Sequence, residues 1–403
     1  MERSGRPRYL RQLRTAGPLE PSSPALHHGR LYRSGPPAGP VTVWLSRDSP
    51  RSGQDSPAWV TASEFQDTAE TLSEKVDLLV DLLRVSRRTI LYTGAGISTA
   101  AGIRQAARSG RKISGGKKKE ATPTVAHRAL VALKERGLVH TWIQQNHDGL
   151  PQKAGWPQED IVEIHGSWFD PSNPVVKYDG DLRDDLYQRM LRAEEEADLV
   201  VVLGTSLSGL NSDRVAESCA RRSVVGTSLG TVIINLQQTS SDLTASLRIF
   251  SPADGVMEAV LSRLAITIPL PGLALALAGR PEERVLVPYD GTGRRSRGRL
   301  MVLDLRPGQA IRLNPGHNCQ GARQPAFLHI GAESREGRRE GRQPGPGRGR
   351  VVGFSHSKAA WDLMVEGVAM VLGGWWLLAA VRGNLETIPV ININPAYTDV
   401  QSQ

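Results

Sequence analysis

Short apolar runs separated by amphipathic stretches set the pattern of the first two thirds of this chain. The runs are rich in Val, Ile and Leu and hold few charged residues, which is typical of strands buried on both faces of a parallel sheet. They occupy residues 90–92, 139–144, 161–164, 199–203 and 232–236. Their alternation with helices predicts a Rossmann-like, doubly wound α/β fold.

Amphipathic segments between the runs supply the helices. Thr71 and Glu74 have the spacing of a capping box, and Val76, Leu79 and Leu82 follow on one helical face. This helix is expected to pack beside the first strand. Further helices are expected over residues 127–133 and 187–196.

The pattern changes after residue 269. Apolar runs at residues 285–287, 300–303, 310–313 and 326–328 are separated by Gly, Pro and Arg. This predicts an appended β-rich accessory domain over residues 269–403. An Arg- and Gly-rich stretch near residues 333–350 is expected to be a disordered loop inside it. The uncharged stretch 367–381 is too short for a membrane span and predicts a buried strand and helix.

The amino-acid composition indicates a basic N-terminal arm and a positive net charge for the whole chain. Residues 1–60 are rich in Arg, Pro, Ser and Gly, so a disordered basic arm is expected. The net charge of +9 suits an acidic partner such as nucleic acid or chromatin. Arginine-rich tails alone give the same figure, so both interpretations stay open.

Cysteine usage and the N-terminus bear on the compartment. The chain has two cysteines, Cys219 and Cys319, which exclude a disulfide framework and a cysteine-based zinc site. An intracellular protein, in the nucleus or cytoplasm, is therefore expected. No apolar run follows the N-terminal positive charges, so no secretory signal is expected, while an organelle transit peptide stays open.

The turn after the first strand is the first candidate site. Gly94 and Gly96 allow the backbone to approach a ligand closely, and a helical stretch begins near Ser98. Unpaired N–H groups at the start of a helix hold pyrophosphate, so this turn predicts a dinucleotide site. The alternative, an ordinary strand-to-helix turn, stays open on this motif alone.

Four later segments place polar side chains where an ordinary parallel-sheet protein has no need of them. They are Gln-Asn-His-Asp at 145–148, Glu-Ile-His-Gly-Ser at 163–167, Val-Leu-Gly-Thr-Ser-Leu at 202–207 and Ile-Ile-Asn-Leu-Gln at 233–237. His165 follows a short strand, at the sheet edge where doubly wound proteins bind ligands. A lone histidine is more often structural. Together with Asn146 and Asp148, however, His165 becomes a candidate catalytic residue.

In this order, and preceded by Gly-Ala-Gly-Ile-Ser at 94–98, these segments resemble the sirtuin family of NAD-dependent protein deacylases. The resemblance covers residues 76–264 and implies a catalytic domain over 61–268 with NAD as its cofactor. The implied reaction transfers an acyl group from a protein lysine to ADP-ribose and releases nicotinamide. It also implies that His165, Asn146 and Asp148 are catalytic.

The remaining site residues are also carried by this resemblance. The implied cofactor-binding residues are Gly94, Ala95, Gly96, Ser98, Ile103, Gln145, Asn146, Asp148, Gly204, Thr205, Ser206, Asn235, Leu236 and Ala253. Val175 and Val176 would pair with the substrate peptide by main-chain hydrogen bonds, and Tyr178 would line the acyl-lysine tunnel.

The chain departs from the family at two places. The family's Pro-Asp-Phe sequence is missing after Ile103, where Gln105, Ala106 and Ala107 stand, so slow deacylation or ADP-ribosyl transfer becomes an alternative. The four cysteines of the family's zinc ribbon are absent between Ser167 and Tyr178. The small module is therefore expected to be reduced, with no zinc bound, although a faulty gene model would look the same.

Three functions follow from these observations. The first is an NAD-dependent protein-lysine deacylase acting on an acyl-lysine protein, with a histone among the candidate substrates. The second is a catalytically weak module that binds NAD or ADP-ribose, and the third is a basic chromatin-associated scaffold. Contact with nucleic acid is expected through the basic arms, and no membrane partner is expected.

Overall fold

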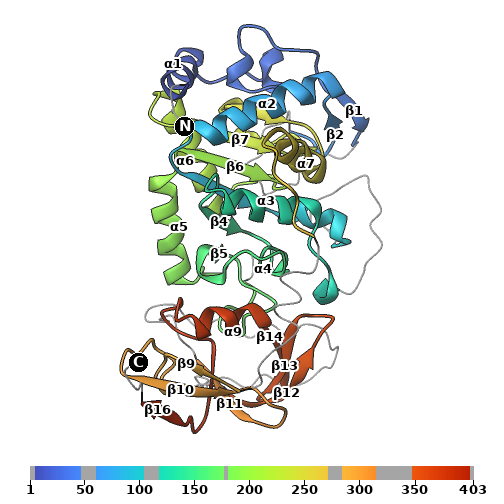
Figure 1. Ribbon diagram of the computed structural model, residues 1–403. Coiled ribbons are helices and arrows are strands. Elements are labelled where there is room, and N and C mark those ends of the chain that lie inside the picture. Colours follow the sequence, from blue (N-terminus) through green and yellow to red (C-terminus); the bar gives the residue numbers. More distant parts are fainter. Residues whose placement is uncertain are drawn as a thin grey trace.

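The computed structural model describes residues 5–46, 60–103, 118–176, 180–270, 284–314 and 347–399. A central sheet with helices on both faces forms one part of the molecule, and a β-rich region lies at its other end (Figure 1). The shorter helices are η3 (Ala95–Ala101), η4 (Lys118–Glu120), α4 (Leu150–Lys153), η5 (Gln158–Asp160), η6 (Asn211–Asp213) and η7 (Ser240–Leu243).

Six parallel strands form the central sheet, in the order β5-β4-β3-β6-β7-β8. They are β3 (Thr89–Thr93), β4 (Thr141–Gln144), β5 (Ile161–Glu163), β6 (Leu199–Leu203), β7 (Gly230–Ile234) and β8 (Leu247–Ile249). The chain runs outward from β3 in one direction and from β6 in the other, so the sheet reverses its order between these two strands. This confirms the predicted doubly wound fold and places its ligand-binding edge after β3 and β6.

Two apolar cores cover the two faces of this sheet. One holds α2 (Ala69–Val85), α3 (Val125–Glu135) and α7 (Ala253–Arg263), packed on strand residues such as Leu91 and Val201. The other holds α5 (Asp184–Glu196) and α6 (Arg214–Val224), packed on residues such as Ile90 and Val200. Neighbouring strand residues point to opposite faces, so a continuous apolar run fills both cores.

The start of α2 differs from the sequence prediction. The helix begins at Ala69, and its cap is Thr68, whose Oγ1 accepts a hydrogen bond from Thr71 N at 3.3 Å. The predicted capping box at Thr71 and Glu74 is therefore wrong. Thr68 has extended backbone angles and a hydroxyl within reach of the first turn, which is what a cap needs.

The predicted disorder of residues 1–60 is corrected for residues 5–46. This segment forms α1 (Arg6–Ala16), η1 (Pro24–His27), η2 (Arg30–Tyr32) and β1 (Val41–Trp44), which pairs with β2 (Glu64–Gln66). Arg30 is fully buried, where it donates hydrogen bonds to Gly17 O and Ser223 Oγ, both at 2.6 Å. Leu13 joins the main core, so the segment buries enough apolar surface to be ordered. Residues 1–4 and 47–59 lie outside the described residues.

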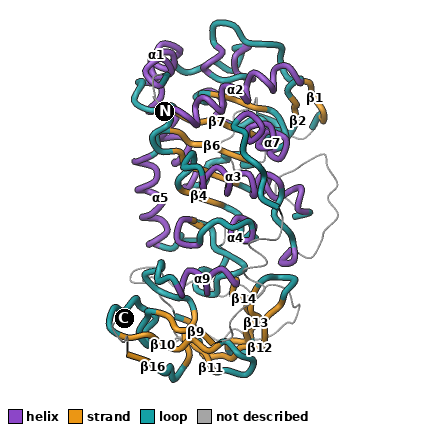
Figure 2. Tube along the Cα trace, in the orientation of Figure 1, coloured by secondary structure: helices purple, strands orange, loops and turns teal. Residues whose placement is uncertain are grey.

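The β-rich C-terminal region consists of two antiparallel sheets, ordered β16-β10-β9 and β14-β13-β12-β11-β15, whose strands are orange in Figure 2. Its elements are β9 (Arg284–Val287), β10 (Arg299–Asp304), β11 (Ala310–Leu313), β12 (Arg348–Ser355), β13 (Ala360–Val365), β14 (Val368–Gly373), α9 (Gly374–Val381), β15 (Val390–Asn392) and β16 (Tyr397–Asp399). The predicted β-rich character is confirmed. The apolar run at 326–328 and most of the loop near 333–350 lie outside the described residues.

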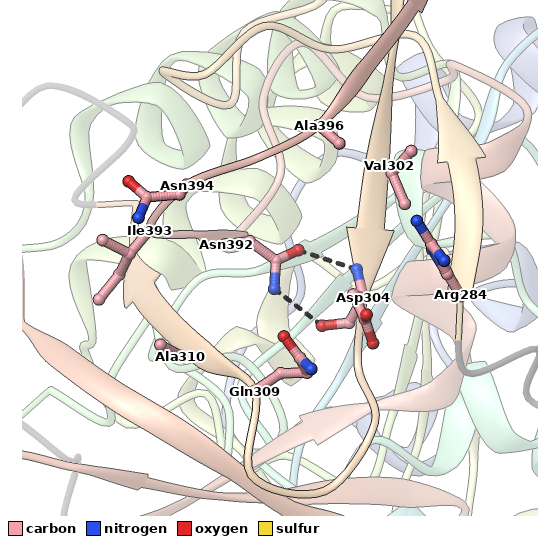
Figure 3. A pocket seen from close by; sticks show the side chains of 9 residues that line it. All are labelled: Arg284, Val302, Asp304, Gln309, Ala310, Asn392, Ile393, Asn394 and Ala396. Carbon is pink, nitrogen blue, oxygen red and sulfur yellow. Dashed lines mark hydrogen bonds between the residues drawn. The ribbon is translucent and has the colours of Figure 1, made fainter.

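Asn392 ties the two C-terminal sheets together beside a cavity of about 350 Å³ (Figure 3). Its Oδ1 accepts a hydrogen bond from Asp304 N at 2.8 Å, and its Nδ2 donates to Asp304 O at 2.9 Å. The Asn392 side chain thus bonds β15 of one sheet to the backbone of β10 in the other. Arg284 and Gln309 also line this cavity.

The stretch 367–381 forms β14 and α9, as the sequence predicts. Trp375 of α9 contacts Phe169, with ring centroids 5.2 Å apart, and Gly373 N donates to Phe169 O at 2.9 Å. The C-terminal region therefore packs against the loop that follows β5. No helix in the described ranges is long and apolar enough to cross a membrane.

Candidate functional site

The glycine turn after β3 lies against the turn after β6. Gly96 N donates to Gly204 O at 2.7 Å. A Cβ on Gly96 would lie 2.5 Å from the Cα of Gly204, and a Cβ on Gly204 would lie 2.5 Å from the Cα of Gly96. Contacts this short allow no side chain at either position. The two glycines that were predicted to bind cofactor thus meet between β3 and β6, where the strand order of the sheet reverses.

We expect Gly204→Ala to lower the free energy of unfolding by about 3 kcal/mol, because it adds steric overlap to an unfavourable backbone angle. Gly204 has φ +64°. Gly137, with φ +68° and open space around its Cα, is the matched control. Gly137→Ala carries only the backbone strain, about 1 kcal/mol. Urea unfolding measures both changes, and equal losses for the two variants would contradict this account of Gly204.

Asn146 and Asp148 meet the glycine turn through Ser98. Asn146 Nδ2 donates to Gly94 O at 3.1 Å and to Ser98 Oγ at 3.0 Å. Ser98 Oγ in turn donates to Asp148 Oδ2 at 2.7 Å. Asp148 is almost fully buried, and its Oδ1 accepts from Leu150 N at 3.1 Å. The loop after β4 and the turn after β3 therefore form one hydrogen-bonded unit.

His165 lies two residues beyond the end of β5, close to the same loop. Its Nε2 is 3.3 Å from Ser212 Oγ. Burial, with the charge of His147 as a second cause, lowers the pKa of His165 to about 4, partly offset by a contact with the Gln145 backbone. The imidazole is therefore neutral at pH 7 and has a lone pair available to accept a proton.

Tyr92, Ser212 and Asp213 complete the site, and sequence reasoning did not single them out. Tyr92 Oη donates to Asp213 Oδ1 at 2.7 Å and lies 2.8 Å from Ser212 Oγ. Gln145 Nε2 donates to Tyr92 Oη at 2.5 Å and to Asp213 Oδ1 at 3.2 Å. Polar residues at 211–213 soon after a buried strand were the available signal.

The other predicted residues on β6 and β7 occupy the neighbouring strand ends. Asn235 Nδ2 donates to Thr205 O at 3.0 Å, which joins the two strand ends. Thr205 is buried and Ser206 is exposed. Leu236 is half-buried, and its carbonyl accepts a hydrogen bond from Phe65 N at 2.8 Å.

Ala95, Ile103 and Ala253 surround the glycine turn less directly. Ala95 begins η3, and Ile103 is buried just beyond it. Ala253 is the first residue of α7, a helix that contacts η3. No hydrogen bond joins these three side chains to the site, since none of them carries a polar group.

The predicted substrate segment lies beside His165. Val176 N donates to His165 O at 3.0 Å, so this backbone donor is used within the chain. A Cβ on Gly166 would lie 2.7 Å from the Cα of Val175, which shows how closely the two segments pack. Tyr178 lies outside the described residues. Residues 164–176 form no helix or strand, and the reduction of the small module stays a prediction.

Glu163, the last residue of β5, is a buried carboxyl group. Burial, with Asp170 as a second cause, raises its pKa to about 7. Gln144 Nε2 donates to its Oε1 at 3.2 Å. The folded-state pKa of Glu163 lies above the usual value of 4.5, so the protonated carboxyl group stabilises the folded state at low pH. This contribution to the free energy of unfolding is lost as pH rises through about 7.

We expect the unfolding free energy of the wild type to fall relative to Glu163→Gln between pH 5 and pH 8. The amide imitates the protonated acid and does not ionise. The relative change is up to about 3 kcal/mol, at 1.36 kcal/mol per unit of pKa. Denaturant unfolding at both pH values measures it, with Glu135→Gln at an exposed position as the control. If the difference in unfolding free energy between the wild type and Glu163→Gln did not vary with pH, the buried, protonated state of Glu163 would be contradicted.

No group of three or more metal-binding side chains is present in the ranges the structure covers. Cys219 is buried in α6, and burial raises the pKa of its thiol to about 11. Cys319 lies outside the described residues. The expected absence of zinc therefore stays a prediction.

Comparison with known proteins links the site to one family. The model of the Sir2 family matches residues 111–173. NAD-dependent protein deacetylase sirtuin-7 of Bos taurus is 28% identical over 261 residues, covering 51% of this chain and 64% of that protein. NAD-dependent protein deacetylase SRT1 of Oryza sativa subsp. indica is 30% identical over 254 residues, covering 51% of each chain.

Other matches agree with these two. NAD-dependent protein deacetylase Sirt6 of Drosophila melanogaster is 29% identical over 275 residues, covering 54% of this chain and 84% of that protein. A solved structure, "Sir2 bound to acetylated peptide", is 24% identical and covers 48% of this chain and 99% of that one. Its TM-score is 0.41. The chain spans between half and two thirds of the length of sirtuin-7 and SRT1.

Proposed function

Because this chain belongs to the Sir2 family, we propose that it is an NAD-dependent protein-lysine deacylase that transfers an acyl group to ADP-ribose and releases nicotinamide. The observation that carries the proposal is the meeting of His165, Asn146 and Gly94 at one edge of the sheet. Asn146 bonds to Gly94 O, and His165 follows the strand beside β4. These groups come from three separate strand ends.

The residues at this edge fit a dinucleotide. A Cβ on Gly94 would lie 2.7 Å from both Gln145 Oε1 and Thr205 Cβ, so the turn needs glycine to bring its backbone this close. Amide and hydroxyl groups of Ser98, Asn146 and Gln145 gather around it. Backbone N–H groups of the turn bind pyrophosphate in such sites, and neighbouring amides and hydroxyls bind ribose.

The chemistry divides between cofactor and protein. When bound, NAD supplies a nicotinamide–ribose bond whose cleavage opens a ribose carbon to the acyl oxygen of the substrate lysine. His165, neutral at pH 7, accepts the proton from a ribose hydroxyl. Asn146 positions the sugar, and Asp148, held by Ser98 and Leu150, orients the carboxamide. Val175 and Val176 support the acyl-lysine peptide, with the backbone of Val175 as the pairing edge.

A mass-spectrometric assay tests this function. The purified chain is incubated with NAD and a panel of acyl-lysine peptides, and nicotinamide and acyl-ADP-ribose are quantified. We expect both products in equal amounts with at least one acyl group, and neither with the unacylated peptides. Absence of acyl-ADP-ribose across the panel would remove the deacylase proposal. Nicotinamide formed with unacylated peptide would favour ADP-ribosyl transfer instead.

The substrate and compartment form a further part of the proposal. The net charge of +9 supports contact with nucleic acid, and on that basis the proposal includes a histone substrate within chromatin and a nuclear or cytoplasmic location. Binding of a DNA duplex should weaken steeply as salt rises, because each neutralised phosphate releases counterions. Binding that does not change between 50 and 200 mM salt would exclude this contact.

A further inference from the structure

Four side chains form a continuous line of hydrogen-bonding groups that starts at His165. Its Nε2 is 3.3 Å from Ser212 Oγ, and Ser212 Oγ is 2.8 Å from Tyr92 Oη. Tyr92 Oη then donates to Asp213 Oδ1 at 2.7 Å. The four residues come from the loop after β5, from η6 and from β3, so tertiary folding alone brings them together.

The line leads away from the surface. Ser212 and Tyr92 are fully buried, and Asp213 is 1% exposed. The other Asp213 oxygen, Oδ2, accepts from Gly209 N at 3.0 Å and from Leu210 N at 2.9 Å. These two backbone bonds fix the carboxyl group, so that its Oδ1 faces Tyr92 and Gln145.

The titrating groups along the line have compatible proton affinities. Burial raises the pKa of Asp213 to about 6, although its hydrogen bonds act in the opposite direction. Burial also raises the pKa of Tyr92 well above its usual value, so this phenol stays protonated. His147 is the titratable group that faces His165 from the loop after β4, and burial lowers the pKa of His147 as well. Asp213 is thus the acceptor at the end of the line.

We propose that Ser212, Tyr92 and Asp213 form a proton relay that positions His165 and carries a proton away from its Nε2. The relay rests on the proposed function, because it serves the proton that His165 removes from a ribose hydroxyl. These three residues act through His165.

The proton balance is complete without another reactant. The other ring nitrogen of His165, which lies beside the Gln145 backbone, takes the hydroxyl proton, and the Nε2 proton passes to Ser212 Oγ. The Ser212 proton passes to Tyr92 Oη, and the Tyr92 proton passes to the Asp213 carboxylate. In total, one proton leaves the ribose hydroxyl and one proton arrives at the Asp213 carboxylate. The hydroxyl groups of Ser212 and Tyr92 each lose one proton and gain another.

Ser212→Ala breaks the relay with the smallest change in volume. We expect kcat for acyl-ADP-ribose to fall by about 10- to 100-fold, less than the roughly 100- to 10,000-fold cost of losing a general base, because His165 itself is kept. KM for NAD should change less than threefold. Ser212→Thr keeps the hydroxyl and should recover most of kcat. Ser218→Ala is the matched control, because Ser218 lies in α6 and bonds to Glu194 at 2.5 Å, away from the site. Exchange of labelled nicotinamide into NAD precedes the proton transfer and should persist in Ser212→Ala.

The pH profile separates a relay from a structural role. Loss of the relay should move the acidic limb of the kcat profile in Tyr92→Phe and Ser212→Ala, but not in Ser218→Ala. An unchanged profile, or loss of nicotinamide exchange in parallel with kcat, would overturn the relay.

The tautomer of His165 gives a readout that needs no turnover. Long-range ¹H–¹⁵N NMR at pH 7 should place the ring proton on Nε2 in the wild type and shift it toward Nδ1 in Ser212→Ala. Identical spectra for these two chains would also overturn the relay. A wild type that makes no product but shows this shift would reject the proposed function and leave the hydrogen-bonded line supported.

Discussion

His165→Ala should reduce formation of acyl-ADP-ribose by at least about 100-fold, the lower end of the range for losing a general base. The variant should bind NAD within about threefold of the wild type, because the groups around the pyrophosphate turn are elsewhere. Those groups, Gly94, Ser98 and Asn146, are joined by their own hydrogen bonds. Isothermal calorimetry with NAD and mass spectrometry of the products measure the two effects separately.

The control for this variant is His356→Ala. His356 is exposed in the C-terminal region and contacts Phe354, with ring centroids 5.2 Å apart. Its replacement should leave both NAD affinity and product formation unchanged. If His165→Ala kept full activity, His165 would be a structural residue and the proposed mechanism would be wrong. If it lost NAD affinity and activity together, His165 would act mainly in binding.

Arg248→Ala should lower the free energy of unfolding by about 3–5 kcal/mol, the usual cost of removing one partner of a buried ion pair. Arg248 and Asp242 are both fully buried, with Nε 3.0 Å from Oδ1. The guanidinium also donates to the carbonyls of Asn235 at 2.9 Å and Ile249 at 2.8 Å, and it bonds to Gln237 O. Its removal takes one donor from each of these carbonyls and leaves the buried Asp242 carboxylate without its counter-charge, with Thr239 N and Thr239 Oγ1 as its remaining donors.

The same change should weaken NAD binding, because Arg248 holds the backbone of Asn235 at the end of β7. Arg263→Ala is the matched control. Arg263 pairs with Asp77 at 2.8 Å, but the two side chains are 34% and 62% exposed. An exposed pair of this kind contributes about 0–1 kcal/mol. Denaturant unfolding compares the variants, and a loss of similar size for both would contradict the role of burial.

The N-terminal segment shows why composition misled the sequence prediction. An Arg-rich stretch reads as solvated because a buried guanidinium costs several kcal/mol unless its donors are paired. Arg30 meets its partners on Gly17, Leu13 and Ser223, and the last of these is far away in the sequence. Arg6 likewise pairs with Asp198 at 2.6 Å. Such distant partners leave no local pattern in the sequence.

The sequence alone determined the parallel sheet, the glycine turn, and the nature of the groups around it. Apolar runs such as Leu199–Leu203 predict buried strands because burial on both faces requires continuous apolar character. Gly94 could be named as a site residue because glycine lets the backbone of a turn approach a ligand, and Asn146 because polar side chains at strand ends have little other use in such a fold.

Tertiary structure alone decided which groups support His165. Ser212 and Asp213 follow β6, and Tyr92 lies within β3, where it read as one more core residue. Their meeting depends on the reversal of strand order between β3 and β6. This reversal brings Ser212 to the same edge of the sheet as His165, about 50 positions earlier, and Tyr92, 120 positions earlier. Hydrogen bonds between distant segments impose no periodicity on the chain, so the sequence specified the fold and the fold selected these partners.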